Sequence, residues 1–280
     1  MQEKKLKANQ LSYSKANGSS YKVLFIEQLD ELYDVPCPEP HTVHILGNGT
    51  NTLFLNHQHS TILSLKKFKN YEFLSGKEIY CEAGVLLPTL INQLAKQGYL
   101  TLEHTYPVPA TLGGAIAQNF GAFGKKMEEF LNEVTYFDFN KQRFHTLTNF
   151  NGTLFYRDSI FKKMNFLIVS AKIKLKKTDP NNALKVINDI AEKRNKLPFQ
   201  KTLGSIFLNP NEKTSAGELL DKLGAKKFIE GDASVSEHHA NIFVNNGKAT
   251  AKEIYNLVKK MQSVCQTELN ISLQPEIVLY

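Results

Sequence analysis

Three side chains stand in surroundings that make a charged or hydroxyl group chemically useful. Arg157 lies between aromatic and apolar residues in the run 154–161, where its charge requires an anion. It pairs with Asp158 or another acid of the chain, or it binds an anionic ligand. Ser205 follows a glycine but has no GxSxG elbow and no evident His–Asp relay, which disfavours a hydrolytic nucleophile and leaves a proton donor open. Glu276 falls in an apolar run, where it faces a core or an interface, or lies on an exposed edge.

Two turns rich in small residues can bring backbone N–H groups close to phosphates. The run Gly47-Asn-Gly-Thr-Asn51 follows an expected strand and either approaches a pyrophosphate or forms an ordinary glycine hairpin. It lacks the third glycine and the following helix of a Rossmann fingerprint. The second turn, 109–115, opens a segment that continues through Asn119 and Gly121 to Gly124. Small side chains there admit a flat ligand, so the two turns together favour a dinucleotide.

Cysteine and histidine positions argue against a metal site. The three cysteines, Cys37, Cys81 and Cys265, are far apart and form no CxxC pair, so neither a structural disulfide nor a zinc site is expected. His238 and His239 are adjacent, and neighbouring residues of an extended segment point to opposite faces. They are therefore poorly placed to share one ion.

Short β-rich runs and helical segments are expected to position the residues of the first half. Leu87, Leu90, Ile91 and Leu94 recur at helical spacing, with Gly98 as a C-terminal cap. Strands are expected at 41–46, 79–83, 134–139 and 166–174, and a further amphipathic helix at 183–190.

The chain changes character around 197–203, where a proline ends a helix and a Gly-Ser segment follows, and we place a domain boundary there. The remainder predicts strand, helix, strand, helix and strand at 206–208, 215–223, 241–244, 250–269 and 273–279. Thr250 and Glu253 have the spacing of a capping box at the start of the long helix.

Length and composition are those of a globular protein of two domains. The chain has 280 residues, of which 42% are hydrophobic and 22% charged. No secretory signal and no apolar run of the ~20 residues of a membrane span is present, so we expect a cytoplasmic protein that binds no membrane. The formal net charge of +7 is scattered and accompanies no nucleic-acid motif, which favours small anionic ligands over nucleic acid. We expect a monomer.

Taken together and in order, these segments resemble the UDP-N-acetylenolpyruvoylglucosamine reductase family. The resemblance covers most of the chain from Gly47 to Glu276, and the region between Gly124 and Tyr156 is short, as in family members without the extra substrate-covering loop. The matching runs are 47–51, 109–115, 118–119, 121–124, 156–161, 204–207, 209–210, 216–217, 233–245, 249–250 and 275–276.

The resemblance implies a mixed fold, between α+β and α/β. An FAD-binding domain of the vanillyl-alcohol-oxidase kind, in two subdomains, would occupy residues 1–198, and a smaller α+β substrate-binding domain residues 199–280. The C-terminal strand of that smaller domain would contribute Glu276 to the active site. The FAD contacts that it implies are Gly47, Asn48, Gly49, Thr50, Asn51, Pro109, Ala110, Thr111, Gly113, Gly114, Asn119, Gly121 and Ala122.

The resemblance also implies a reaction. NADPH would reduce the flavin, and the enolpyruvyl group of the UDP-sugar would then take a hydride from flavin N5 at C3. Arg157 and Glu276 would stabilise the negative charge that develops, and Ser205 would protonate C2. Tyr156, Asn209 and Lys226 would contact the substrate, the last of them at its diphosphate.

Two departures from the family pattern and two other interpretations accompany this resemblance. Ala110 stands where the family usually has glycine, which would hinder FAD if that position needs a positive φ, and Thr50 replaces a serine. The chain could instead be another FAD-linked oxidoreductase of the same superfamily, or an inactive nucleotide-binding protein. The joint presence of Arg157, Ser205 and Glu276 favours the reductase.

Overall fold

The computed structural model describes residues 1–35, 43–55, 61–163, 165–195, 197–198 and 201–280. The chain packs into two compact units. The first unit comprises Met1–Lys4, Lys22–Asn48 and Ser60–Arg194, and the second comprises Lys5–Tyr21, Gly49–His59 and Asn195–Tyr280. The last break lies close to the expected boundary after residue 198. The two early segments of the second unit lie in the part that the sequence assigned to the first domain, and the domain assignment itself stays a prediction.

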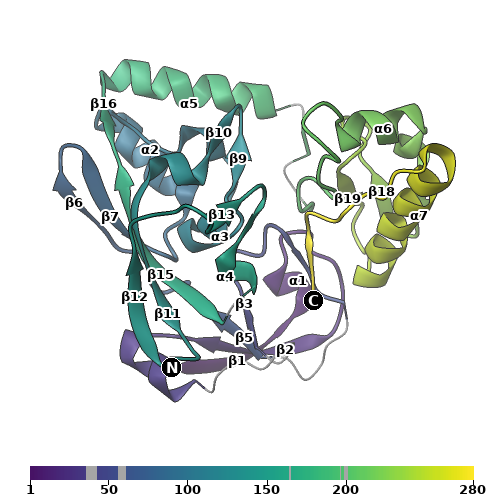
Figure 1. Cartoon of the computed structure of the whole chain (residues 1–280). Coiled ribbons are helices and arrows are strands. Elements are labelled where there is room, and N and C mark those ends of the chain that lie inside the picture. Colours follow the sequence, from purple (N-terminus) through teal and green to yellow (C-terminus); the bar gives the residue numbers. More distant parts are fainter. Residues whose placement is uncertain (36–42, 56–60, 164, 196, 199–200) are drawn as a thin grey trace. The chain divides into compact units, whose positions relative to one another are not determined.

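An antiparallel sheet of five strands forms the centre of the first unit. Its order is β12 (Arg143–Leu147), β11 (Leu131–Asp138), β15 (Phe166–Lys174), β7 (Glu78–Glu82) and β6 (Tyr71–Ser75) (Figure 1). Residues 166–171 of the central strand are all buried, so both of its faces are covered. The strands expected at 79–83, 134–139 and 166–174 are confirmed. Their continuous apolar or alternating runs are typical of buried strands, which is why the sequence could predict them.

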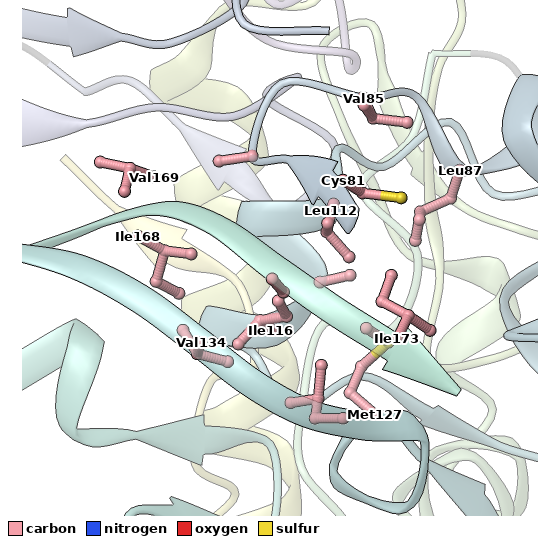
Figure 2. Packing of buried hydrophobic residues seen from close by; sticks show 14 of the residues in the cluster. Cys81, Val85, Leu87, Leu112, Ile116, Met127, Val134, Ile168, Val169 and Ile173 are labelled. Atoms are coloured by element: carbon pink, nitrogen blue, oxygen red, sulfur yellow. The ribbon is translucent and has the colours of Figure 1, made fainter. Parts of the chain in front are cut away.

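Helices α2 (Leu87–Lys96) and α3 (Leu112–Ala117) pack in the core of this unit, and α5 (Pro180–Arg194) packs on α2. Figure 2 shows Leu112 and Ile116 of α3 beside Val134, Ile168 and Ile173 of the sheet. The helix expected from Leu87 onward is confirmed, with Gly98 following it at a φ of +77°. The expected helix at 183–190 is confirmed and is longer, because it also includes the polar residues at both of its ends.

A smaller sheet has the order β1 (Gln2–Lys7), β2 (Ser20–Phe25), β5 (Thr61–Ser64) and β3 (Val43–Ile45), with β2 and β3 parallel to β5. The strand expected at 41–46 is confirmed for 43–45, and 41–42 lie outside the described residues. The sequence did not predict β1 or β2. The first unit also contains α4 (Ile160–Lys163) and three short strand pairs, whereas α1 (Ala8–Leu11) belongs to the second unit. The pairs are β8 (Tyr99–Leu100) with β16 (Lys176–Lys177), β9 (Gly121–Ala122) with β10 (Lys125–Lys126), and β13 (Leu154–Phe155) with β14 (Asp158–Ser159).

The described part of the second unit contains a three-stranded antiparallel sheet and, besides the short α1, two longer helices. The strands are β17 (Ile229–Glu230), β18 (Ala233–Val235) and β19 (Phe243–Asn245), and the helices are α6 (Ala216–Lys222) and α7 (Ala251–Leu269). At the end of the chain, β20 (Val278–Leu279) pairs in parallel with β4 (Thr52–Leu53). The helices expected at 215–223 and 250–269 are confirmed. No helix among the described residues is both long and apolar enough to cross a membrane.

Of the strands expected in this unit, one does not form and another is shorter than predicted. Residues 206–208 form no regular strand, and only Val278–Leu279 of the run 273–279 is one. Isolated bridges join Ser205 to Ile242 and Phe207 to Pro275 instead. The apolar pattern identified buried residues, but their backbone partners change from one residue to the next, which prevents a continuous ladder.

The capping box at the start of α7 is confirmed. The Glu253 N–H donates to Thr250 Oγ1 at 3.2 Å, and the Thr250 N–H donates to Glu253 Oε2 at 2.7 Å. Ile254, Leu257, Val258 and Met261 are buried along one face of the same helix. Two otherwise unpaired N–H groups at the helix end are thereby satisfied.

Replacing Thr250 by alanine removes the cap without disturbing the buried face. We expect the T250A variant to lose about 1 kcal/mol of unfolding free energy, measured by urea denaturation. The matched control is Thr148→Ala, at an exposed threonine outside any helix or strand. Equal stabilities of the two variants would contradict this role for Thr250.

Candidate active site

Gly47 and Asn48 of the first predicted phosphate-binding turn lie beside the second turn in the first unit. A Cβ added at Gly47 would come within 2.5 Å of Thr111 Oγ1, so only glycine allows this approach. The side-chain amide of Asn48 donates to the carbonyl of Pro109 at 2.7 Å. Turns that are about 60 residues apart in the sequence therefore meet, as a common dinucleotide site requires.

The second turn leads directly into α3. Thr111 caps this helix, with its hydroxyl accepting from the Gly114 N–H at 3.4 Å. A Cβ at Gly113 would lie 3.0 Å from that of Ala83, so the small residue allows α3 to pack against the end of β7. Ala110 is not among the non-glycine residues with positive φ, and its carbonyl accepts from the Leu87 N–H at 3.0 Å. The alanine at this position is therefore unstrained, and the departure from the family pattern imposes no backbone penalty.

A pocket of about 230 Å³ adjoins these turns, and both Asn48 and Thr111 line it. Its other lining residues are Lys66, Lys69, Tyr71, Gly84, Val85, Leu86, Thr89 and Leu90. Apolar walls suit a flat ring system, and lysine side chains suit phosphates. The pocket and the close-packed glycines fit a portion of FAD, so the residues of the first unit can hold this cofactor.

The rest of the first glycine turn belongs to the second unit and is used in packing. Gly49 has a φ of +68°, and a Cβ there would lie 1.9 Å from the carbonyl oxygen of Leu11. Its own carbonyl accepts from the Tyr13 N–H at 2.9 Å. The Asn51 amide donates to the carbonyl of Glu276 at 3.1 Å. Thr50, which lies between Gly49 and Asn51 in the sequence, is half-buried. This part of the turn thus has a structural task in addition to the predicted contact with FAD.

Arg157 occupies the tight turn between β13 and β14. It has a φ of +55°, an uncommon conformation for a residue with a side chain, and follows the exposed Tyr156. Its guanidinium carbon lies 5.4 Å from the centroid of the Phe120 ring and 5.9 Å from that of Tyr156. The carboxylate of Asp158 is engaged by Lys163 at 2.6 Å and by Lys162 at 3.8 Å.

Three residues predicted to contact FAD also support this turn. Asn119 is buried at a φ of +39°, and its amide donates to the Phe155 carbonyl at 3.0 Å while its oxygen accepts from the Glu128 N–H at 3.3 Å. A Cβ at Gly121 would lie 3.7 Å from Nη1 of Arg157. Ala122 pairs with Lys125 in the short hairpin β9–β10. The small residues of this segment therefore allow Arg157 to lie against it.

The backbone segments that contain Ser205 and Glu276 are paired in the second unit. The Glu276 N–H donates to the carbonyl of Ile206 at 2.7 Å, so the residue after Ser205 is bonded directly to Glu276. Both residues are half-buried. The structure thus pairs the backbone segments of two predicted catalytic residues that are about 70 positions apart in the sequence.

Sequence reasoning missed Asn241, whose buried side chain fixes the same segment. Its amide donates to the Phe207 carbonyl at 2.8 Å, and its oxygen accepts from the Phe207 N–H at 2.9 Å. The Ile206 N–H also donates to the backbone carbonyl of Asn241. The available signal was an asparagine, a residue depleted in strands, inside the expected strand 241–244.

Asn209 and Lys226, the predicted substrate contacts of this unit, lie around α6. The side-chain oxygen of Asn209 accepts from the Ala216 N–H at 3.0 Å, and Lys226 forms an ion pair with Asp221 at 2.9 Å. Burial, and then the charge of Lys226, lower the pKa of His239. Among the described residues, no three His, Cys, Asp or Glu side chains form a group that could hold a metal ion.

Two protein-family models match the chain. Residues 195–280 match the model described as the C-terminal domain of UDP-N-acetylenolpyruvoylglucosamine reductase. Residues 26–145 match a model described as an FAD binding domain. The first match contains Ser205, Asn209 and Glu276, and the second contains the turns at Gly47 and Thr111.

Individual relatives carry the same description. The UDP-N-acetylenolpyruvoylglucosamine reductase of Carboxydothermus hydrogenoformans is 35% identical over 237 residues, which cover 83% of this chain and 78% of the relative. That of Fusobacterium nucleatum is 29% identical over 270 residues, covering 96% and 95%. The crystal structure of the Thermus caldophilus reductase superposes with a TM-score of 0.87 at 27% identity, covering 100% of this chain and 99% of that one.

The packing role of Gly49 can be separated from any contact with a cofactor. We expect Gly49→Ala to lower the unfolding free energy of the flavin-free protein by at least about 2 kcal/mol, because the new methyl group meets the Leu11 carbonyl in a left-handed backbone. The control is Gly76→Ala, where nothing lies within 4 Å of the added Cβ. Chemical denaturation of both variants measures the difference, and a Gly49→Ala variant as stable as the control would refute the packing role.

Proposed function

Because the chain belongs to the UDP-N-acetylenolpyruvoylglucosamine reductase family, an FAD-dependent group of oxidoreductases of peptidoglycan synthesis, we propose that it reduces UDP-N-acetylenolpyruvoylglucosamine to UDP-N-acetylmuramate with NADPH as reductant. One observation carries the proposal to this chain's own residues. The backbone segments that carry Ser205 and Glu276 are paired, since the Glu276 N–H donates to the carbonyl of Ile206. Pairing of these segments supports the proposal, because the proposed reaction needs both a proton donor and an ionisable group at the substrate.

The cofactor would be held by the two turns of the first unit and by the pocket beside them. Gly47 and Thr111 allow close approach of the backbone, and Lys66 and Lys69 contribute positive charge at the pocket. When bound, FAD supplies the hydride that the enolpyruvyl group receives at C3. The chain's own residues then have three tasks: to bind the substrate, to stabilise the charge that develops, and to deliver a proton.

Charge stabilisation falls to Arg157 and Glu276. Hydride addition at C3 moves negative charge toward the carboxylate end of the enolpyruvyl group, where a fixed guanidinium stabilises it. The φ of +55° and the contact with the Phe120 ring hold Arg157 in one place, which reduces the cost of reorganisation. Glu276 would serve as an acid or through a hydrogen bond.

Proton delivery falls to Ser205. An ordinary serine hydroxyl is a weak acid, so it transfers a proton only to a strongly basic, carbanion-like carbon such as C2 after hydride addition. The fixed backbone on either side of Ser205 supports this role, since Ile206 and Phe207 make hydrogen bonds to Asn241. A backbone fixed by these hydrogen bonds would keep the Ser205 hydroxyl oriented during the reaction.

Substrate binding would use Tyr156, Asn209 and Lys226. Tyr156 is 57% exposed and can stack or donate a hydrogen bond, and Asn209 and Lys226 offer an amide and a positive charge for the UDP-sugar. For Lys226, binding of the diphosphate would compete with its ion pair to Asp221. The expectations of a monomer and of a cytoplasmic location stay predictions.

Replacing Ser205 by alanine separates the two halves of the reaction. Reduction of the flavin by NADPH should keep its wild-type rate, because this step needs no proton from the serine. Reoxidation by the enolpyruvyl substrate should slow by about a hundredfold or more. Anaerobic stopped-flow absorption measures both rates.

The matched control for this experiment is Ser263→Ala, at an exposed serine on α7. It should resemble the wild type in both half-reactions. If Ser205→Ala slowed both half-reactions equally, or neither, the role given to Ser205 would be wrong.

A further inference from the structure

A second arginine lies close to Arg157 in the first unit. Arg194 is the last residue of α5, and its guanidinium carbon lies 5.8 Å from the centroid of the Phe120 ring, against 5.4 Å for Arg157. Phe123, in the turn between β9 and β10, lies 5.0 Å from the same guanidinium carbon of Arg194. Two guanidinium groups from a helix end and a hairpin turn therefore share one aromatic ring.

Arg194 is held in a defined orientation. Its Nη2 donates to the carbonyl of His104 at 2.8 Å, while its Nε is buried and has no hydrogen-bond partner among the described residues. The imidazole of His104 stacks on Phe130, with 5.0 Å between ring centroids. Burial lowers the pKa of His104 to about 4, so this ring is neutral at pH 7 and adds no charge. The Nε–H thus has no acceptor among the described residues, whereas Nη2 is fixed by the His104 carbonyl.

The surroundings of Arg194 are short of negative charge. No carboxylate of the described residues forms an ion pair with it, and the nearby Glu103 is paired with Lys125. Burial, and then the neighbouring charge of Arg157, lower the pKa of Arg194 to about 10, which still leaves it protonated at pH 7. Two like charges at one partly buried ring repel each other, and an anion bound beside them relieves that repulsion.

We propose that Arg194 is a specificity-determining residue that acts with Arg157 on the carboxylate of the enolpyruvyl group. The inference rests on the proposed function, in which Arg157 faces that carboxylate. A planar guanidinium matches the two oxygens of a carboxylate, whereas a lysine offers only a point charge. The contacts with Phe120, Phe123 and His104 fix the plane of Arg194 before the ligand arrives.

The chain offers a matched control in Lys193. It has the same charge, is exposed, and its Nζ lies 5.9 Å from the Phe123 ring. It lacks the buried contacts that hold Arg194. Removing its charge therefore tests how much a change in net charge alone contributes.

The experiment compares two ligands on the oxidised holoenzyme, without NADPH, by isothermal titration calorimetry. UDP-N-acetylenolpyruvoylglucosamine has the carboxylate, and UDP-N-acetylglucosamine lacks it. Arg194→Gln should weaken binding of the first by about tenfold and of the second by less than about twofold. Arg194→Lys should recover part of the loss, and Lys193→Gln should bind both ligands as the wild type does.

Several outcomes would overturn the inference. If Arg194→Gln keeps the wild-type ratio of the two affinities, or weakens both ligands equally, Arg194 does not recognise the carboxylate. If Arg194→Gln shifts the flavin midpoint potential but leaves the ratio of the two ligand affinities unchanged, Arg194 acts on the cofactor and not on the carboxylate. A wild-type protein that binds neither ligand, or binds both equally well, would contradict the proposed function itself. Arg194→Lys, the milder change, is the variant to measure if Arg194→Gln fails to fold.

Discussion

Backbone N–H and C=O groups that are buried need hydrogen-bond partners, and no regular sheet supplies them for the segment 205–207. Two other segments of the second unit supply them instead. The side chain of Asn241 bonds both backbone groups of Phe207, and the carbonyl of Ile206 accepts from Glu276. Beyond Glu276 the chain enters β20, which pairs with β4. The hydrogen bonds of this irregular segment therefore pair the stretch that contains Ser205 with the stretch that contains Glu276.

The first unit has a different task, which is to hold two arginine side chains in fixed positions. Aromatic rings do this, since Phe120 contacts both Arg157 and Arg194, and Phe123 covers Arg194. Glycine and asparagine make room for the arrangement, because Gly121 lies against Arg157 and Asn119 ties the hairpin to the end of α3. Several residues that the sequence predicts to contact FAD therefore also position an arginine.

Sequence patterns predicted the regular elements well where periodicity and capping were strong, as in α2, α7 and β15. They failed where the backbone is irregular, at 206–208 and 273–277, because an apolar run records burial and not the identity of the hydrogen-bond partner. For the candidate site, the motifs identified Arg157, Ser205 and Glu276. They could not identify Asn241 or Arg194, whose importance arises from contacts between segments far apart in the chain.

The most direct test of the account is an anaerobic absorption spectrum of the purified protein, taken before NADPH, after NADPH, and after UDP-N-acetylenolpyruvoylglucosamine. The account predicts flavin bands that bleach with NADPH and return when one equivalent of the enolpyruvyl substrate is added without oxygen. Bands that return only with oxygen would contradict the substrate assignment. A protein that binds no flavin would contradict the account as a whole.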